Sequence, residues 1–167
     1  DKTKFMSRLP LFILAPLPLF ILQPLLQRLV QTVARQRPEL FRRLGAQETK
    51  RFLINPVNLP FSFLLYPDAK APTLTAWRKE VVPIHDAEIA GSFLTLLNMV
   101  DGQLDGDALF FNRHLKIEGD VEAVVVLRNA LDDLEGSIAD DLAAALGPPG
   151  KAGLRALRKL RSKLHDE

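Results

Sequence analysis

The sequence predicts an α/β (α+β) fold in which a small mixed sheet packs against helices. Three short runs rich in aromatic and β-branched residues, separated by Asn, Pro and Asp, lie in the middle of the chain and are typical of strands. Apolar residues at spacings of three and four occur on both sides of this region, as amphipathic helices require. At 167 residues, the chain has room for one moderate core with additions at both ends.

Composition divides the chain into three parts. Residues 1–37 form an apolar arm punctuated by prolines, residues 38–146 the predicted α/β domain, and residues 147–167 a linker and a basic helix. Residues 1–51 contain ten Lys or Arg and three acids, whereas residues 101–141 contain three and eleven, and the tail from Leu142 contains six and two. This uneven distribution of charge predicts basic ends that face an anionic surface and an acidic centre held away from it.

The arm from Phe5 to Leu26 is the most apolar stretch, with no charged residue between Arg8 and Arg28. It is long enough to span a bilayer, but its four prolines would break a single helix where lipid offers no replacement hydrogen-bond partner. No small-residue cleavage site follows, so a secretory signal is not expected. The arm is therefore expected to lie in a membrane interface, to cover the body of the protein, or to complete the core or an oligomer contact.

Two helices are predicted next. Pro24 suits a first helical turn, and the helix that follows should end near Arg37, ahead of Pro38. A shorter helix from Glu39 to Leu44 should end at Gly45 in a left-handed cap. The apolar face of the first helix consists of Leu25, Leu26, Leu29, Val30 and Val33, with Arg28 and Arg35 outside it.

The predicted strands follow from residue 52. In the second strand Phe61, Phe63 and Leu65 alternate and should share one face, while Leu64 and Tyr66 on the other face are not polar either. This strand is therefore expected to be covered on both sides. Residues 84–91 continue the pattern more weakly. The three clear strands are Phe52–Ile54, Phe61–Tyr66 and Thr73–Arg78.

A helix, a turn, a strand and a second helix are predicted between residues 92 and 136. Ser92 should cap a helix, and Asp105 to Asp107 should form a turn around Gly106. Residues His114–Gly119 alternate as a half-buried strand, and Asp120 should cap a helix that runs to about Gly136. The apolar residues of the helix after Ser92 are Phe93, Leu94, Leu96, Leu97 and Val100.

The C-terminal part is predicted to hold a short helix, Ile138–Leu146, then a linker from Gly147 to Gly150, then a basic amphipathic helix. A helix of this composition is expected at an anionic membrane surface. The alternative is a helix packed on its own or a neighbouring subunit with a solvated basic face. Its leucine stripe is Leu154, Leu157, Leu160 and Leu164, surrounded by Arg155, Arg158, Lys159, Arg161 and Lys163.

Patterns for catalysis or metal binding are missing from the sequence. The acids from Asp101 to Asp107 have calcium-loop spacing, but Asn112 occupies the position that needs a bidentate Glu. His85, His114 and His165 have no neighbours at metal-ligand spacing, and the chain has no cysteine. We therefore expect no metal, no cofactor and no enzymatic activity. The basic ends lack interleaved aromatic residues, so no nucleic acid is expected as a partner.

Residues 105–135 resemble the C-terminal half of the sterol carrier protein type 2 (SCP-2) domain, where a strand written like LKIEGD also leads into the last helix. The resemblance is clear over about residues 50–135 and is strongest at Asp107–Asp120. It implies a five-stranded sheet and helices around a hydrophobic cavity for an acyl, sterol or isoprenoid ligand, with residues 38–146 as the lipid-binding domain. A plain core role is the alternative for each lining residue. By this resemblance the lining would be Phe61, Phe63, Leu65, Trp77, Phe93, Leu94, Leu97, Phe110, Phe111, Val124 and Val125.

The run ALFFNRHLKIEGD, taken together with the apolar arm, is similar to the UbiT group of proteobacterial accessory factors. This resemblance implies a non-enzymatic lipid carrier in oxygen-independent ubiquinone biosynthesis, acting beside the UbiU and UbiV proteins. The expected ligand is an isoprenoid quinone precursor or an anionic phospholipid such as phosphatidic acid. The alternative is a scaffold for biosynthetic enzymes without an internal ligand.

The protein is expected to be cytoplasmic and peripherally associated with the inner membrane, because basic residues near a surface attract anionic head groups. A homo-oligomer is left open. The expected head-group contacts are Lys2, Lys4, Arg8, Arg28, Arg155, Arg158 and Lys159.

Overall fold

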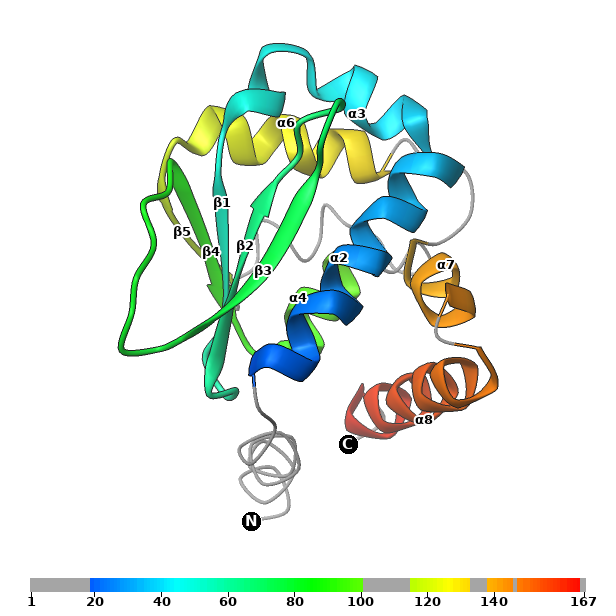
Figure 1. Ribbon diagram of the computed structural model, residues 1–167. Helices are drawn as coiled ribbons and strands as arrows, with labels where there is room; N and C mark the ends of the chain where they lie inside the picture. The colour runs from blue at the N-terminus through cyan, green and yellow to red at the C-terminus, as the bar shows by residue number, and fades with distance from the viewer. Residues whose placement is uncertain (1–18, 101–114, 133–137, 146, 166–167) are drawn as a thin grey trace.

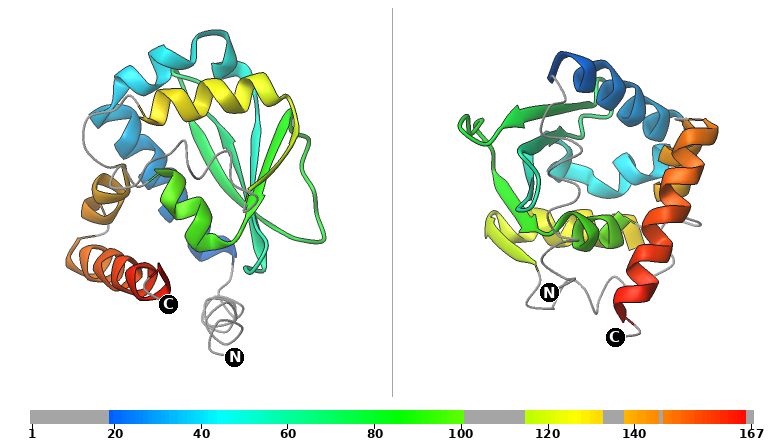
Figure 2. Two further views of the ribbon diagram at one scale, coloured as in Figure 1. Left: turned by 180° about the vertical axis from the view of Figure 1, so that it is seen from behind. Right: turned by 90° about the horizontal axis from the view of Figure 1, so that it is seen from below.

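A five-stranded sheet with all of its described helices on one face forms the fold (Figures 1 and 2). The computed structural model describes residues 19–100, 115–132, 138–145 and 147–165. The first eighteen residues of the arm, the turn at Asp105 to Asp107 and the calcium-like spacing lie outside this range. The strand order is β3-β2-β1-β4-β5; β1 and β4 are parallel and the other neighbours are antiparallel. The predicted α/β class with a mixed sheet of five strands is thereby confirmed.

The strands lie close to where the sequence predicted them. β5 begins at Lys116 rather than at His114, and β4 occupies only the second half of the weak pattern at residues 84–91. Short turns rich in Pro, Asn and Asp connect β1 to β2 and β2 to β3; in the second of these, the carboxylate of Asp68 accepts a hydrogen bond from the backbone of Lys70. The bounds are β1 Phe52–Pro56, β2 Phe61–Tyr66, β3 Thr73–Arg78, β4 Ala87–Gly91 and β5 Lys116–Gly119.

Strand register decides which side chains enter the core. Phe52 pairs with Leu65 and Ile54 with Phe63, so these four side chains share the face covered by helices. Phe52 and Ile89, on neighbouring strands of that face, are completely buried. The core therefore lies between this face of the sheet and the helix layer.

Helix α2, Leu19–Gln36, covers the β3 side of that face (Figure 1). The prediction that the helix starts at Pro24 is wrong, because the helix already includes Leu19 and holds Pro24 in its interior. The amide that Pro24 lacks would have bonded to the carbonyl of Phe20. Pro24 and Phe20 are both exposed, so water can bond to that carbonyl and the helix continues.

Two glutamine side chains attach α2 to the open edge of β3. The Gln23 amide donates to the Ala76 carbonyl (2.8 Å) and accepts from the Ala76 N–H (2.9 Å). Gln27 donates to the carbonyl of Pro72 (3.1 Å). Backbone groups at a sheet edge otherwise lack partners. α2 therefore closes the edge of the sheet as well as covering its face.

Replacing Gln23 with alanine should lower the free energy of unfolding by about 2 kcal/mol, because two hydrogen bonds to the edge strand are lost at roughly 1 kcal/mol each. Urea denaturation measures the change. Gln31→Ala, at an exposed position on the same helix, is the matched control and should stay within about 0.5 kcal/mol of wild type. Equal stabilities of the two variants would contradict the attachment.

Helix α3, Pro38–Leu44, follows directly and is succeeded by a 3₁₀ turn, Gly45–Thr49. Gly45 has the predicted positive φ of 57°, but its ψ of −125° is not that of a left-handed helical cap. The predicted cap geometry is wrong because the chain turns straight into the 3₁₀ segment. Leu40, Phe41 and Leu44 face the core from α3.

Side-chain caps begin the next two helices as predicted. The Ser92 hydroxyl accepts from the Thr95 N–H (3.2 Å) at the start of α4, Phe93–Val100. An Asp120 carboxylate oxygen accepts from the Ala123 N–H (3.1 Å) at the start of α6, Val121–Asp132. That hydrogen bond holds the pKa of Asp120 below its ordinary value, with a further contribution from Lys50. Residues 133–137, where the predicted helix would end, lie outside the described range.

Two helices form the C-terminal part, α7, Ile138–Ala145, and α8, Pro148–His165. The predicted linker from Gly147 to Gly150 is wrong from Pro148 onward, because these residues form the first turn of α8. Proline is tolerated there since a first-turn amide has no partner within the helix. Leu154 of α8 packs on Ala143 of α7.

Candidate lipid-binding cavity

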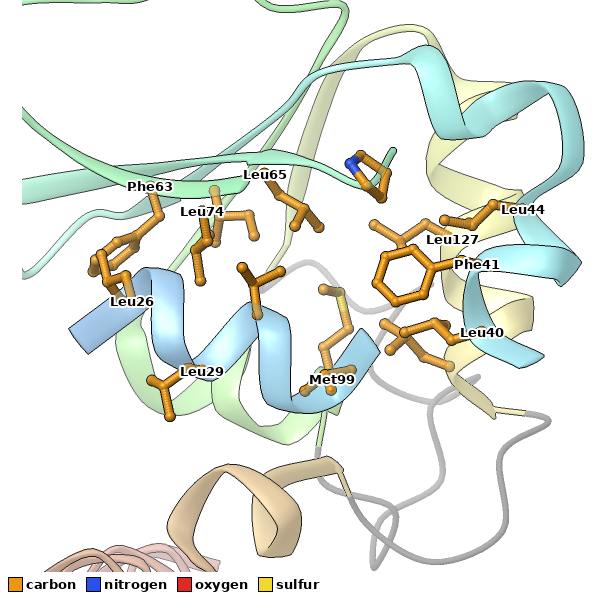
Figure 3. Close-up of a pocket in the computed structure, with 15 residues that line it drawn as sticks. Leu26, Leu29, Leu40, Phe41, Leu44, Phe63, Leu65, Leu74, Met99 and Leu127 are labelled. Carbon is orange, nitrogen blue, oxygen red and sulfur yellow. The ribbon is translucent and has the colours of Figure 1, made fainter. Parts of the chain in front are cut away.

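An apolar cavity of about 280 Å³ lies between the sheet and α2 (Figure 3). α2 forms one wall and strands β1, β2 and β3 the other, while α3, α6 and the end of α4 close the space between them. Every lining residue is apolar. They are Leu26, Leu29, Val30, Val33, Leu40, Phe41, Leu44, Ile54, Phe63, Leu65, Pro67, Leu74, Met99, Leu127 and Leu131.

Local sequence explains each wall. The face of α2 that contributes Leu26, Val30 and Val33 has the three- and four-residue spacing of an amphipathic helix. Phe63 and Leu65 alternate along β2, so both side chains point from the sheet towards α2, as does Leu74 on β3 (Figure 3). The cavity walls therefore form where the apolar face of the amphipathic helix α2 lies opposite the apolar face of strands β2 and β3.

The two ends of the cavity differ in burial. At the α3 end, Phe41, Leu44 and Leu127 are at most 5% exposed. At the end nearer the start of α2, Leu26 and Phe63 are only partly buried. The described part of the chain therefore forms a cavity with a closed end against α3 and α6 and a more open end at the start of α2.

The chemistry of the cavity restricts its ligand. An unpaired polar group buried there would lose its hydrogen bonds to water without replacement, at a cost of several kcal/mol. An apolar chain pays no such penalty and gains about 0.8 kcal/mol for each methylene removed from water. The cavity therefore suits the apolar part of a ligand, with any head group left at the open end.

Two of the residues expected to line the cavity do so, Phe63 and Leu65. Phe61 is buried on the same strand face, but its ring lies under the guanidinium of Arg78 and it is not part of the lining. Trp77 lies on the opposite face of β3, where its indole N–H donates to Thr75 (2.8 Å). Phe110 and Phe111 lie outside the described residues.

The remaining predicted residues lie in helices α4 and α6 but outside the lining. Leu97 packs towards the contact between Ala143 and Leu154, and Val124 is buried in the main core, with Val125 packed against that core. From α4 the lining residue is Met99, rather than Phe93, Leu94 or Leu97. α6 presents Leu127 and Leu131 to the cavity in place of Val124 and Val125.

The lining residues that sequence reasoning missed come mostly from α2 and α3. The apolar face of α2 is visible in the sequence, but nothing local indicates that this face covers the sheet. For α3, the buried Leu40, Phe41 and Leu44 have the spacing of a helix face that could have been recognised. The spacing of apolar residues identifies which face of a helix is buried, but it does not show which other element that face packs against.

The residues expected to contact lipid head groups differ in their exposure and in their contacts. Arg28, Arg155 and Lys159 are exposed. Arg158 instead donates to the Asp140 carboxylate (2.9 Å), with 18% of its side chain exposed. It therefore joins α8 to α7. Lys2, Lys4 and Arg8 lie outside the described residues.

A second, polar hollow of about 200 Å³ lies on the opposite face of the sheet, beside Asn55 and Glu88. The Asn55 amide donates to Glu88 (2.9 Å), and Lys79 donates to Asn55 and to the Pro56 carbonyl. Burial lowers the pKa of Lys79, although Glu88 acts in the opposite direction. These bonds fix the start of the β3–β4 loop to β1.

Metal-ligating side chains do not gather in the described ranges, where no three His, Asp or Glu residues come close enough to hold an ion. Within the same ranges, no helix combines the length and apolar character needed to cross a membrane.

A mixed sheet that encloses a wholly apolar cavity with its helix layer defines a binder of long apolar molecules. The sequence model of the SCP-2 sterol transfer family matches residues 26–132, and the chain belongs to this family of lipid carriers. The match begins inside α2 and ends with the last residue of α6, so it contains every residue that lines the cavity.

Solved structures of the same fold include a UbiJ-SCP2 ubiquinone synthesis protein, with 16% identity, a TM-score of 0.51, and coverage of 67% of this chain and 89% of that one. Sterol carrier protein 2 from Yarrowia lipolytica matches at 15% identity and a TM-score of 0.45, over 66% and 87%. The sterol carrier protein domain 2 of Helicoverpa armigera matches at 13% and 0.44, over 71% and 91%. Among curated protein sequences, none matches this chain.

Proposed function

We propose that this protein is a non-enzymatic carrier that holds a long apolar ligand in the cavity between α2 and the sheet and serves ubiquinone biosynthesis at the membrane. The observation that carries the proposal is a cavity lined entirely by apolar side chains in a chain of the SCP-2 family. Eight buried methylenes would contribute about 6 kcal/mol, at roughly 0.8 kcal/mol each. This is enough to extract a chain from solvent without any polar contact in the cavity.

The link to ubiquinone is supported by the similarity of ALFFNRHLKIEGD to the UbiT group and by the similarity of the fold to a UbiJ-SCP2 ubiquinone synthesis protein. The specific proposal is an oxygen-independent pathway, with UbiU and UbiV as partners. The ligand is an isoprenoid quinone precursor or an anionic phospholipid such as phosphatidic acid. In both, an apolar chain would fill the cavity and a polar group would stay at the open end.

Native mass spectrometry of the full chain purified from cells tests the carrier function. The expected spectrum contains a protein–lipid complex, and solvent extraction should release a lipid in up to equimolar amount. Incubation of delipidated protein with vesicles should restore the complex. Protein that is free of lipid after purification, and that takes up none from anionic vesicles, would refute the carrier function.

An exposed apolar loop favours a second candidate function, that of a scaffold for biosynthetic enzymes. Val81, Val82 and Ile84, between β3 and β4, are exposed, and Ile84 is 84% exposed. Apolar groups gathered on a surface mark protein contacts. A variant with serine at all three positions should lose binding to UbiU and UbiV and keep its lipid if the scaffold function holds. Retained partner binding with the same lipid content would favour the carrier alone.

A further inference from the structure

Helix α8 lies beyond the residues matched by the family and is fixed to the body by one face (Figure 1). Leu154 is 8% exposed and packs on Ala143 of α7, with Leu97 of α4 beside them. The ion pair between Arg158 and Asp140 joins the same two helices. The orientation of α8 about its own axis is therefore set by apolar packing and one charged contact.

Beside the packed face, α8 carries a row of four cations, Lys151, Arg155, Lys159 and Lys163, hereafter the basic ridge. The four residues recur at intervals of four, so the row starts next to Leu154 and winds gradually to the opposite side of the helix over about 18 Å, at 1.5 Å per residue. All four are exposed. None has an ion-pair partner in the part of the chain that the structure describes.

Such a row is unfavourable in the isolated protein. Like charges four residues apart on a helix repel, and each pair destabilises it by a few tenths of a kcal/mol. Two acids of α7, Asp140 and Asp141, pair with Arg158 and Arg37 rather than with the ridge. An anionic partner would relieve this repulsion.

We propose that the basic ridge of α8 docks the protein onto an anionic lipid surface. Beside the ridge lie the small residues Ala152 and Ala156 and the partly buried Leu160. Helix α8 has no Trp, Tyr or Phe of the kind that anchors protein interfaces or stacks on single-stranded nucleic acid. A lipid surface needs no anchor of this kind, because lysine and arginine near anionic head groups bind through charge alone.

A second feature at the same end of the molecule agrees with a lipid partner. The start of α2 lies at the lower end of Figure 1, as α8 does, and its Phe20 and Ile21 are 76% and 50% exposed. The more open end of the cavity is also at the start of α2. Docking through α8 would therefore bring the open end of the cavity towards the source of its ligand. This orientation rests on the proposed carrier function, whereas the docking surface does not.

Vesicle flotation with the full chain tests the ridge. Vesicles of phosphatidylcholine alone are compared with vesicles that also contain phosphatidylglycerol. The ridge variant replaces Lys151, Arg155, Lys159 and Lys163 with glutamine. The control variant removes the same charge from exposed positions elsewhere, with glutamine at Arg42, Arg51, Lys70 and Lys116.

Wild type should bind the anionic vesicles, and 0.5 M salt should release it because screening shortens the reach of charges to a few ångströms. Each cation near the surface contributes about fivefold, from roughly 1 kcal/mol, so the ridge variant should bind at least 100-fold more weakly. The control variant should stay within about fivefold of wild type. The proposal is overturned if the ridge variant binds like wild type, if both variants lose binding equally, or if duplex DNA competes for the ridge more strongly than the vesicles do.

The lipid extracted from the same preparations separates the two proposals. Ridge-dependent vesicle binding by a protein that neither contains lipid after purification nor takes it up from the vesicles would refute the carrier function and support the docking surface. If the protein has normal lipid content and the ridge variant binds vesicles as well as wild type does, the docking surface is overturned and the carrier function remains supported.

Discussion

A variant with Leu65→Trp and Leu74→Trp should carry at least tenfold less lipid than wild type and remain folded. Both leucines lie on the helix-covered face of the sheet and point into the cavity (Figure 3). The two indole rings would occupy much of the 280 Å³ that is available to a ligand chain. Overpacking a filled core costs about 1–3 kcal/mol, but an existing cavity can accept the added atoms with less strain.

Lipid extraction and native mass spectrometry measure this effect, and circular dichroism confirms that the variant is folded. Leu64→Trp is the matched control, because Leu64 lies on the same strand with its side chain on the opposite face of the sheet. This control should retain wild-type lipid content. A folded double variant with undiminished lipid would show that the ligand is held elsewhere.

Gly119→Ala should lower the free energy of unfolding by about 3–4 kcal/mol, more than the same substitution at Gly45 or Gly153. Gly119 ends β5 with φ of 84°, which for a residue with a Cβ costs about 1–3 kcal/mol. A Cβ there would also overlap the carbonyl oxygen of Asp86. That carbonyl accepts the Asp120 N–H (2.9 Å), so the clash would disturb the start of α6 as well.

Two other glycines separate the causes of that loss. Gly45 also has a positive φ but has open space around its Cβ position, so Gly45→Ala should cost only the backbone strain. Gly153, within α8, has neither constraint, and Gly153→Ala should stabilise the protein by up to about 1 kcal/mol. Urea denaturation ranks the three variants. A Gly119→Ala variant no less stable than Gly45→Ala would disprove the close approach of β5 to Asp86.

The local signals in the sequence predicted most of the elements. Runs of aromatic and β-branched residues between turn residues located β1, β2 and β3, and the side chains of Ser92 and Asp120 cap their helices as expected. Strands and caps of this kind depend on residues within a few positions of one another. Sequence reasoning failed where a local rule was outweighed by its surroundings. Pro24 was expected to begin a helix, yet α2 continues through it because packing on β3 holds the helix on both sides of the proline.

The cavity walls were harder to predict because both faces of β2 and β3 carry apolar residues. On β3 the large Trp77 was the expected lining residue, but α2 covers the face that holds Leu74 and Ala76. The small side chain of Ala76 lets α2 come close enough for Gln23 to bond to the backbone there. The lining carried over from the SCP-2 resemblance therefore named Trp77, whereas the cavity is lined by Leu74 of the same strand.

Helix α8 shows the same difference between what is evident in the sequence and what is decided by packing. Its leucine stripe and its cations are evident in the sequence, but Arg158 differs from its neighbours only because Asp140 lies opposite it on α7. Once Arg158 is assigned to that contact, the outward row of Lys151, Arg155, Lys159 and Lys163 becomes the candidate surface.

By itself, the sequence determined the α/β class, the five strands, the two helix caps and, through its SCP-2 resemblance, an apolar ligand. The tertiary structure decided which apolar faces meet, and hence which residues line the cavity, where it is more open and which cations face outward. The physical reason is the distance along the sequence over which each kind of interaction acts. Periodicity and capping act between residues close in the chain, whereas the cavity and the basic ridge depend on packing between segments far apart in sequence, such as α2 with β3 and α8 with α7.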